Sequence, residues 1–200
     1  MGKIEKVTDH AIRSLWREGN PNKAVLAGVR GAASLDSRRA QPVWPVMMAS
    51  LDANMLSRDG RPTYAETAVY AALRFYAIHQ QGRDQFAYGS ARSDDQTKGT
   101  GLFKALAQLR SQPDRRDALD RRVKALLATS NVTSMIQSLS HLVSILKAAS
   151  PAVKIDYAAL AQDLYDAQFG TSAANQVHLR WGQRYYWNVK SEKPTEGKNN

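Results

Sequence analysis

The amino-acid sequence predicts an all-α protein, a compact bundle of about eight helices divided into two lobes. Apolar residues recur at helical spacing along almost the whole chain. No alternating, β-branched run of strand length is bounded by turn signals. Hydrophobic residues make up 43% of the 200 residues, which is enough to build a sizeable core.

The first half of the chain shows several helix-start and helix-stop signals. The helices expected there cover residues 4–18, 21–35, 42–51 and 63–81. The first ends at the segment "EGNP", after which Asn20 is expected to cap the second helix, with Pro21 at its first position. Pro45 interrupts the short third helix, and a polar connector leads from it to the long fourth helix.

Residues 82–100 form a loop much longer than the usual connection of about 4–6 residues, so a functional or mobile segment is expected there. The loop divides the chain into an N-terminal lobe, 1–92, and a C-terminal lobe, 93–188. Helices are expected after it at residues 101–111, 114–129, 132–149, 157–168 and 173–188. Pro113 and Asp156 mark two of the starts. The polar tail, 189–200, lacks periodicity and is predicted to be disordered.

The overall charge favours an anionic partner. The formal net charge is +10, and nucleic acid is the usual partner of so basic a chain, although an anionic membrane surface or an acidic protein would also fit. The absence of cysteine excludes disulfides, thiolate zinc sites and cysteine nucleophiles, and suits a reducing compartment. No signal-peptide core or membrane-spanning run is visible, so we expect a soluble, cytoplasmic protein with no membrane contact.

Positive charge is concentrated in residues 101–150, which hold eight basic residues and three acidic ones. On a helical wheel of 114–129, Leu119, Val123, Leu126 and Leu127 define the buried face. The neighbouring arginines suit bidentate contact with phosphate. For any single arginine, however, a solvated position or an ion pair with Asp117 or Asp120 explains the pattern better.

Signatures of catalysis and of metal binding are weak. The four histidines are scattered, and no HExxH, GxSxG or GxGxxG motif occurs. The pairs Asp94 with Asp95 and Asp163 with Asp166 offer carboxylates for Mg²⁺, but ordinary solvated side chains explain both pairs better. We therefore expect no catalytic residue, no bound metal and no cofactor.

Aromatic residues offer one further route to nucleic acid, because Tyr and Phe can stack on unpaired bases. Phe86 and Tyr88, in the long loop, are better candidates for this role than the "RYYW" segment near the C-terminus. Trp16, Trp44 and Trp181 have apolar neighbours in sequence and are expected in the core.

Laid end to end, these segments resemble the CasB family, the small subunit of the type I-E CRISPR surveillance complex Cascade. The matching segments are "LAGVRGAAS", "VWPVM", "VYAALRFYAIHQQG", "GTGLFKALAQLR", "LDRRVKALLATSNVTSMIQSLSHLVSILKA", "KIDYAALAQDLYDAQ" and "VHLRWGQRYYW". They follow the family's order and cover most of residues 13–187. Gly31 follows Arg30 where the family often has paired arginines, and Ser140 and His141 stand near another arginine position.

The resemblance implies a non-catalytic, all-helical protein, usually present in two copies within a crRNA-guided antiviral complex. Its partners would be crRNA and target DNA, the backbone and large subunits of Cascade, and a second copy of itself. Its basic surface would steady the guide–target region and the displaced DNA strand of the R-loop. On this interpretation the expected phosphate contacts are Lys98, Lys104, Arg121, Arg122 and Lys124, followed by Arg30, Arg61 and Arg110.

Two other classes of protein are compatible with the same residues. A basic helical adaptor for an acidic protein would show similar charge and helices, and would bind its partner without nucleic acid. A small metal-dependent nuclease, the less favoured alternative, would depend on Asp94 and Asp95 and would cleave DNA or RNA when Mg²⁺ is added.

Overall fold

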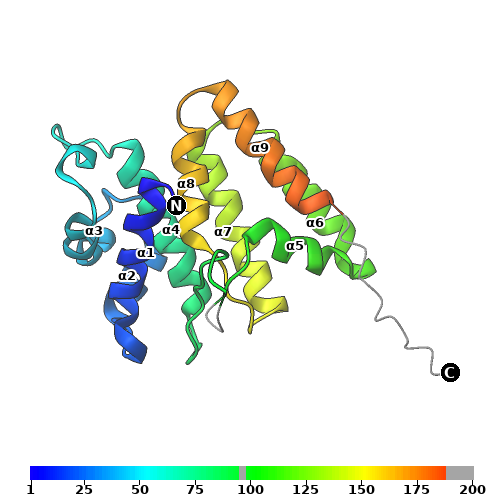
Figure 1. Ribbon diagram of the computed structural model, residues 1–200, viewed down its shortest axis with the longest axis horizontal. Helices are drawn as coiled ribbons and strands as arrows, with labels where there is room; N and C mark the ends of the chain where they lie inside the picture. Colours follow the sequence, from blue (N-terminus) through cyan, green and yellow to red (C-terminus); the bar gives the residue numbers. More distant parts are fainter. Residues whose placement is uncertain (95–97, 188–200) are drawn as a thin grey trace.

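The computed structural model describes residues 1–94 and 98–187, and in these ranges the chain is all-α (Figure 1). Its helices are α1 (Lys3–Trp16), α2 (Lys23–Gly31), α3 (Trp44–Ser50), α4 (Tyr64–Gln80), α5 (Leu102–Arg110), α6 (Pro113–Leu127), α7 (Val132–Ala149), α8 (Tyr157–Ala167) and α9 (Thr171–Tyr186). The all-α prediction is confirmed. The predicted disordered tail, 189–200, lies outside the described residues.

Helix α4 lies at the centre of the packing. It is apolar on nearly every side, and 13 of its 17 residues are buried, which is typical of a helix surrounded by other helices. Helices α1, α2, α7 and α8 all pack against it. Thr63 and Glu66 form a capping box at its start, so the buried N-terminal N–H groups have partners.

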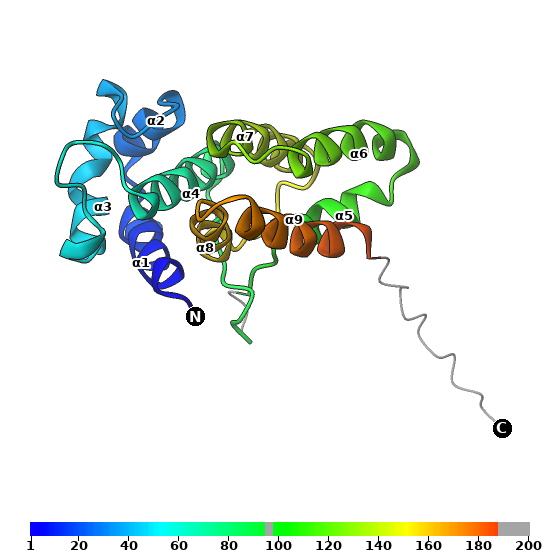
Figure 2. The same ribbon diagram turned by 90° about the horizontal axis from the view of Figure 1, so that it is seen from above.

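The molecule is elongated (Figure 2). Seen from above, α7 and α6 follow one another along one long side, and α8 and α9 follow one another along the other. Helices α2 and α3 lie at one end of the molecule, and the turn between α5 and α6 lies at the other. Among the described residues, no helix combines the length and the apolar character that crossing a membrane would require.

Helix α8 connects the two predicted lobes, because it packs against α1 and α4 on one side and against α9 on the other. The buried apolar residues accordingly form one continuous cluster that draws on both halves of the chain. The boundary near residue 92 stays a prediction.

The second helix differs from expectation at both ends. Asn22, not Asn20, is its cap, and the Asn22 side chain accepts a hydrogen bond from the Val25 N–H at 3.2 Å. The helix also ends at Gly31 rather than continuing to residue 35, and a short 3₁₀ helix, Arg38–Val43, folds back on it. Gly28 makes this close approach possible, because a Cβ there would lie 2.7 Å from the Arg39 carbonyl oxygen.

The long loop between α4 and α5 is anchored by backbone hydrogen bonds to the segment before α8. The Ile155 N–H donates to the Ala87 carbonyl at 3.0 Å, and the Asp156 N–H donates to the Thr100 carbonyl at 2.9 Å. Where the loop closes on itself, a Cβ at Gly99 would lie 1.9 Å from the Gly89 carbonyl oxygen, so only glycine fits there. The described parts of the loop are therefore fixed on the body of the protein.

A buried histidine ties the end of α4 to this region. His79 is 0% exposed, and its two ring nitrogens lie 2.7 Å from Arg83 Nη1 and 2.8 Å from the Tyr157 hydroxyl. Because a guanidinium can only donate, Nε2 accepts, and the proton of the neutral ring lies on Nδ1, facing Tyr157. Burial, with Arg83 and Lys147 nearby, lowers the pKa of His79 from 6.5 to about 3.

We predict that His79 makes the free energy of unfolding depend on pH between about 6.5 and 3. In this range the unfolded chain binds a proton at His79 and the folded chain does not. The stability that depends on this group is therefore fully present above pH 6.5. It decreases as the pH is lowered from about 6.5 to about 3, by up to about 1.4 kcal/mol per pH unit. Urea unfolding of the parent and His79→Gln across this range should show a shallower slope for the variant, and equal slopes would contradict the prediction.

Candidate nucleic-acid-binding surface

The predicted cations of α6 lie on its solvent face. Leu119, Val123 and Leu126 are buried and Leu127 is half-buried against the core, which confirms the expected apolar side of this helix. Five cationic residues of α6 are exposed, among them the three predicted contacts Arg121, Arg122 and Lys124. None of the three forms an ion pair with a carboxylate of the described residues, and Arg122 Nη1 donates to the Ala118 carbonyl at 2.9 Å. Their charges are thus available to an external anion.

A second group of cations lies where α5 meets α9. Exposed Lys104 on α5 lines an open hollow of about 450 Å³ together with Gln183, Arg184 and Trp187. The Trp187 side chain is 74% exposed. A large aromatic surface thus lies beside cationic groups at the "RYYW" segment, which its sequence alone made a weaker candidate than Phe86 and Tyr88.

Arg110, in contrast, is engaged within the protein. Its Nε and Nη2 atoms donate to the two carboxylate oxygens of Asp120 at 2.7 and 3.1 Å, and the Tyr185 hydroxyl donates to the same carboxylate at 2.7 Å. The Arg110 guanidinium also lies over the rings of Tyr185 and Tyr186. The hydrogen bond from Arg110 lowers the pKa of Asp120, so the ion pair persists in mildly acidic solution.

The remaining predicted contacts are dispersed. Lys98, in the loop before α5, is exposed, and its Nζ lies 3.7 Å from an Asp94 carboxylate oxygen. Arg61 is exposed just before α4, and Arg30 is half-buried on α2. Because α2 and the α5–α6 turn lie at opposite ends of the molecule (Figure 2), the structure brings only part of the predicted set onto neighbouring helices.

Phe86 and Tyr88, the candidates for stacking on bases, are both folded onto the protein by the loop. Tyr88 is 1% exposed, and its hydroxyl donates to the carboxylate of Asp9 on α1. The Phe86 ring stacks on Trp16, with 4.9 Å between ring centroids. Of the tryptophans expected in the core, Trp181 is fully buried, while Trp16 and Trp44 are half-buried.

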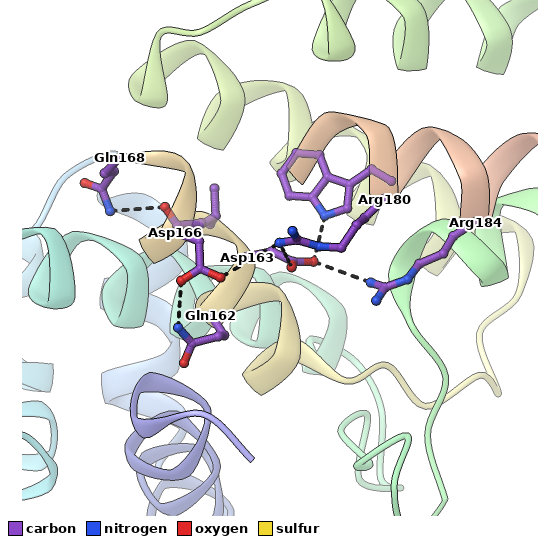
Figure 3. A network of polar contacts seen from close by, with 8 residues as sticks. Gln162, Asp163, Asp166, Gln168, Arg180 and Arg184 are labelled. Carbon is purple, nitrogen blue, oxygen red and sulfur yellow. Dashed lines mark hydrogen bonds and ion pairs between the residues drawn. The ribbon is translucent and has the colours of Figure 1, made fainter. Parts of the chain in front are cut away.

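Asp163 is not the solvated side chain that its sequence context suggested (Figure 3). It is 8% exposed and accepts hydrogen bonds from the Trp181 indole at 2.8 Å and from Arg180 at 2.9 Å. Arg184 lies 3.5 Å from the same carboxylate. Asp166 accepts from Gln162 at 2.9 Å and lies 3.8 Å from Arg180. This network joins α8 to α9, and its carboxylates are already occupied by cations.

No group of three or more metal-ligating side chains occurs within residues 1–94 and 98–187. Asp94 is exposed and faces Lys98, and Asp95 lies outside the described residues.

Comparison with known proteins agrees with the fold. The model of the CRISPR-associated protein Cse2 family matches residues 25–186, so the chain belongs to that family. The structure is also similar to that of CasB from Thermobifida fusca, with a TM-score of 0.69 and 24% sequence identity, covering 94% of this chain and 99% of that one. No match was found among curated proteins. The family assigned from the sequence is therefore confirmed, and membership supports a role as a Cascade small subunit.

We predict that Asp120→Ala lowers the free energy of unfolding by about 1–3 kcal/mol, because Arg110 and the Tyr185 hydroxyl both lose their acceptor. Asp117→Ala, a change at an exposed position on the same helix, is the matched control and should be nearly neutral. Because the pKa of Asp120 is lowered in the folded chain, the difference between parent and variant should shrink as the pH falls below about 4. Urea unfolding measures both effects, and equal stabilities at pH 7 would contradict the prediction.

Proposed function

We propose that the chain is a non-catalytic small subunit of a crRNA-guided Cascade complex and contacts nucleic-acid backbone through cations on α5 and α6. Membership in the Cse2 family supports the assembly. The observation that carries the contact is the exposed group Arg121, Arg122 and Lys124, which has no carboxylate partner among the described residues. Its partners would be crRNA and target DNA, the backbone and large subunits, and a second copy of the chain.

The chemistry required for this role is modest. Opening a DNA duplex against a guide RNA is a nearly balanced exchange of base pairs, so contacts to the backbone can shift the equilibrium without reading sequence. Lys104, Arg121, Arg122 and Lys124 suit such contacts because they are exposed on two adjacent helices. Lys98, Arg30 and Arg61 would add contacts elsewhere, whereas Arg110 would first have to share its bond with Asp120.

The hollow at Lys104 adds a preference for unpaired strands to this proposal. Trp187 presents its ring to solvent beside Lys104 and Arg184, and an unpaired base can stack on such a ring while the cations contact its phosphates. A paired base has no free face to offer. On this basis the displaced strand is the ligand that the α5–α9 side suits best.

The first test is a triple charge reversal, Lys104→Glu with Arg121→Glu and Arg122→Glu. The variant should fold normally, because Leu119, Val123 and Leu126 are unchanged, and it should still join its partner subunits. Affinity of the assembled complex for target DNA should fall by at least about tenfold, to a similar extent for all sequences. The slope of log affinity against log salt should fall by about 0.9 per lost duplex contact, or about 0.7 on single strands.

The matched control for net charge is Lys6→Glu with Arg38→Glu and Arg58→Glu, three exposed positions on the α1–α3 side of the molecule. This control should bind more tightly than the α5–α6 variant. Equal affinities and salt slopes for the two variants would show that only net charge matters. If the α5–α6 variant loses a protein partner and keeps its affinity for nucleic acid, the surface belongs to an adaptor for an acidic protein.

The second test concerns stacking. Trp187→Ala should weaken binding to single-stranded oligonucleotides by about 1–3 kcal/mol, and Trp187→Phe should retain most of the affinity because it keeps an aromatic face. Affinity for duplex DNA should change little in either variant. Fluorescence anisotropy with labelled strands measures these affinities, and equal losses for single strands and duplex would rule out stacking.

A further inference from the structure

A further concentration of positive charge lies away from the exposed cations Lys104, Arg121, Arg122 and Lys124. It is found between α2 and the turn after α4. A hollow of about 380 Å³ is lined there by Lys23 and Arg30 from α2 and by Gln81 and Arg83 from the turn after α4. Asp84 lines the hollow as well, but its side chain is exposed. The walls therefore bring together basic groups from segments about fifty residues apart in the chain.

Arg83 is held in a fixed position at this hollow. Its Nη1 atom donates to His79 Nε2 at 2.7 Å and to the Val153 carbonyl at 3.1 Å. Both acceptors are uncharged, because the pKa of His79 is lowered to about 3 and the ring is neutral at physiological pH. The guanidinium is thus oriented without being neutralised, and its other N–H donors have no partner among the described residues.

Lys147 of α7 adds a fourth positive charge near the hollow. Its Nζ donates to the Gln81 side chain at 3.3 Å. Burial lowers the pKa of Lys147, and the nearby Arg30 and Arg83 lower it further. None of Lys23, Arg30, Arg83 and Lys147 forms an ion pair with a carboxylate in the part of the chain that the structure describes. Cations held together in this way repel one another, and an anion between them would remove the repulsion.

We infer that this hollow, lined by Lys23, Arg30 and Arg83 and with Lys147 bonded to its lining residue Gln81, is a binding site for a phosphate group. A fixed guanidinium presents a fork of donors that matches phosphate oxygens, and a lysine ammonium adds a point charge. The hollow lies at the lower end of the range of about 300–1,000 Å³ for small-ligand sites, which leaves room for the group that carries the phosphate. That group is either a nucleic-acid backbone or a free phosphorylated molecule.

The test compares the parent with a site variant, Arg30→Gln with Lys147→Gln, and with a control, Lys6→Gln with Arg58→Gln, at two exposed positions outside the proposed nucleic-acid contacts. Both variants remove two positive charges. Arg83 is kept because it also supports His79 and Val153. Thermal melting is followed while inorganic phosphate is titrated against sodium chloride at constant ionic strength. The parent and the control should show a saturable rise in Tm of about 2–4 °C, and the site variant should not.

Saturation and the control are essential, because phosphate also stabilises proteins through exclusion from their surface, an effect that continues to grow with concentration. Without phosphate, the site variant should melt at or above the parent temperature, since it has less internal repulsion. A second variant, Arg30→Lys with Lys147→Arg, keeps the charge and should restore the saturable response. A response that is unsaturable, or equal in the parent and in the site variant, would overturn the inference.

Binding of a labelled single-stranded oligonucleotide then distinguishes the two sources of phosphate. Loss of affinity in the site variant, alongside loss of the phosphate response, identifies a nucleic-acid backbone as the ligand. Unchanged oligonucleotide affinity with loss of the phosphate response identifies a free phosphorylated molecule. The proposed function fails separately, because that failure would appear as unchanged nucleic-acid affinity in the triple charge-reversal variant of Lys104, Arg121 and Arg122.

Discussion

The burial of α4 is the constraint on which the rest of the structure depends. A helix with 13 of 17 residues buried must be covered on nearly all sides, and α1, α2, α7 and α8 provide that cover. Its buried polar residues hold the segments that enter and leave it. Glu66 accepts from the Ser57 and Thr63 N–H groups, and Gln80 accepts from the Ala87 N–H. The cations of α6 are excluded from this centre, so they face solvent on a helix that needs only one apolar side.

Most of the fold could be predicted because helix signals are local. Pro113 begins α6, and Asp156 caps α8 by accepting from the Ala159 N–H, as their positions in the sequence suggested. The start of α2 was misplaced because the segment "NPN" offers two asparagines that can both cap a helix. Which one does so depends on the turn after α1, where Arg17 and Glu18 take left-handed backbone conformations that no sequence pattern indicates.

The candidate sites were less predictable because they depend on contacts between distant segments. The exposed face of α6 follows from its own periodicity and was found. The partners of Asp163 lie 17 and 18 residues further along the chain on α9, and Tyr88 meets Asp9 across 79 residues, so neither burial could be seen locally. Arg83 and Lys147 carry no motif at all. Only the folded chain shows that their charges meet beside Arg30.

The unequal burial of the four tryptophans has a spectroscopic consequence. Trp181 is fully buried, Trp16 and Trp44 are half-buried, and Trp187 is 74% exposed, so a soluble quencher reaches the last indole far more readily than the others. Emission from Trp187 should lie at longer wavelength than emission from Trp181, because water relaxes around an exposed excited indole. The chain therefore carries its own optical reporter beside Lys104 and Arg184, and occupancy of that hollow can be followed without an attached dye.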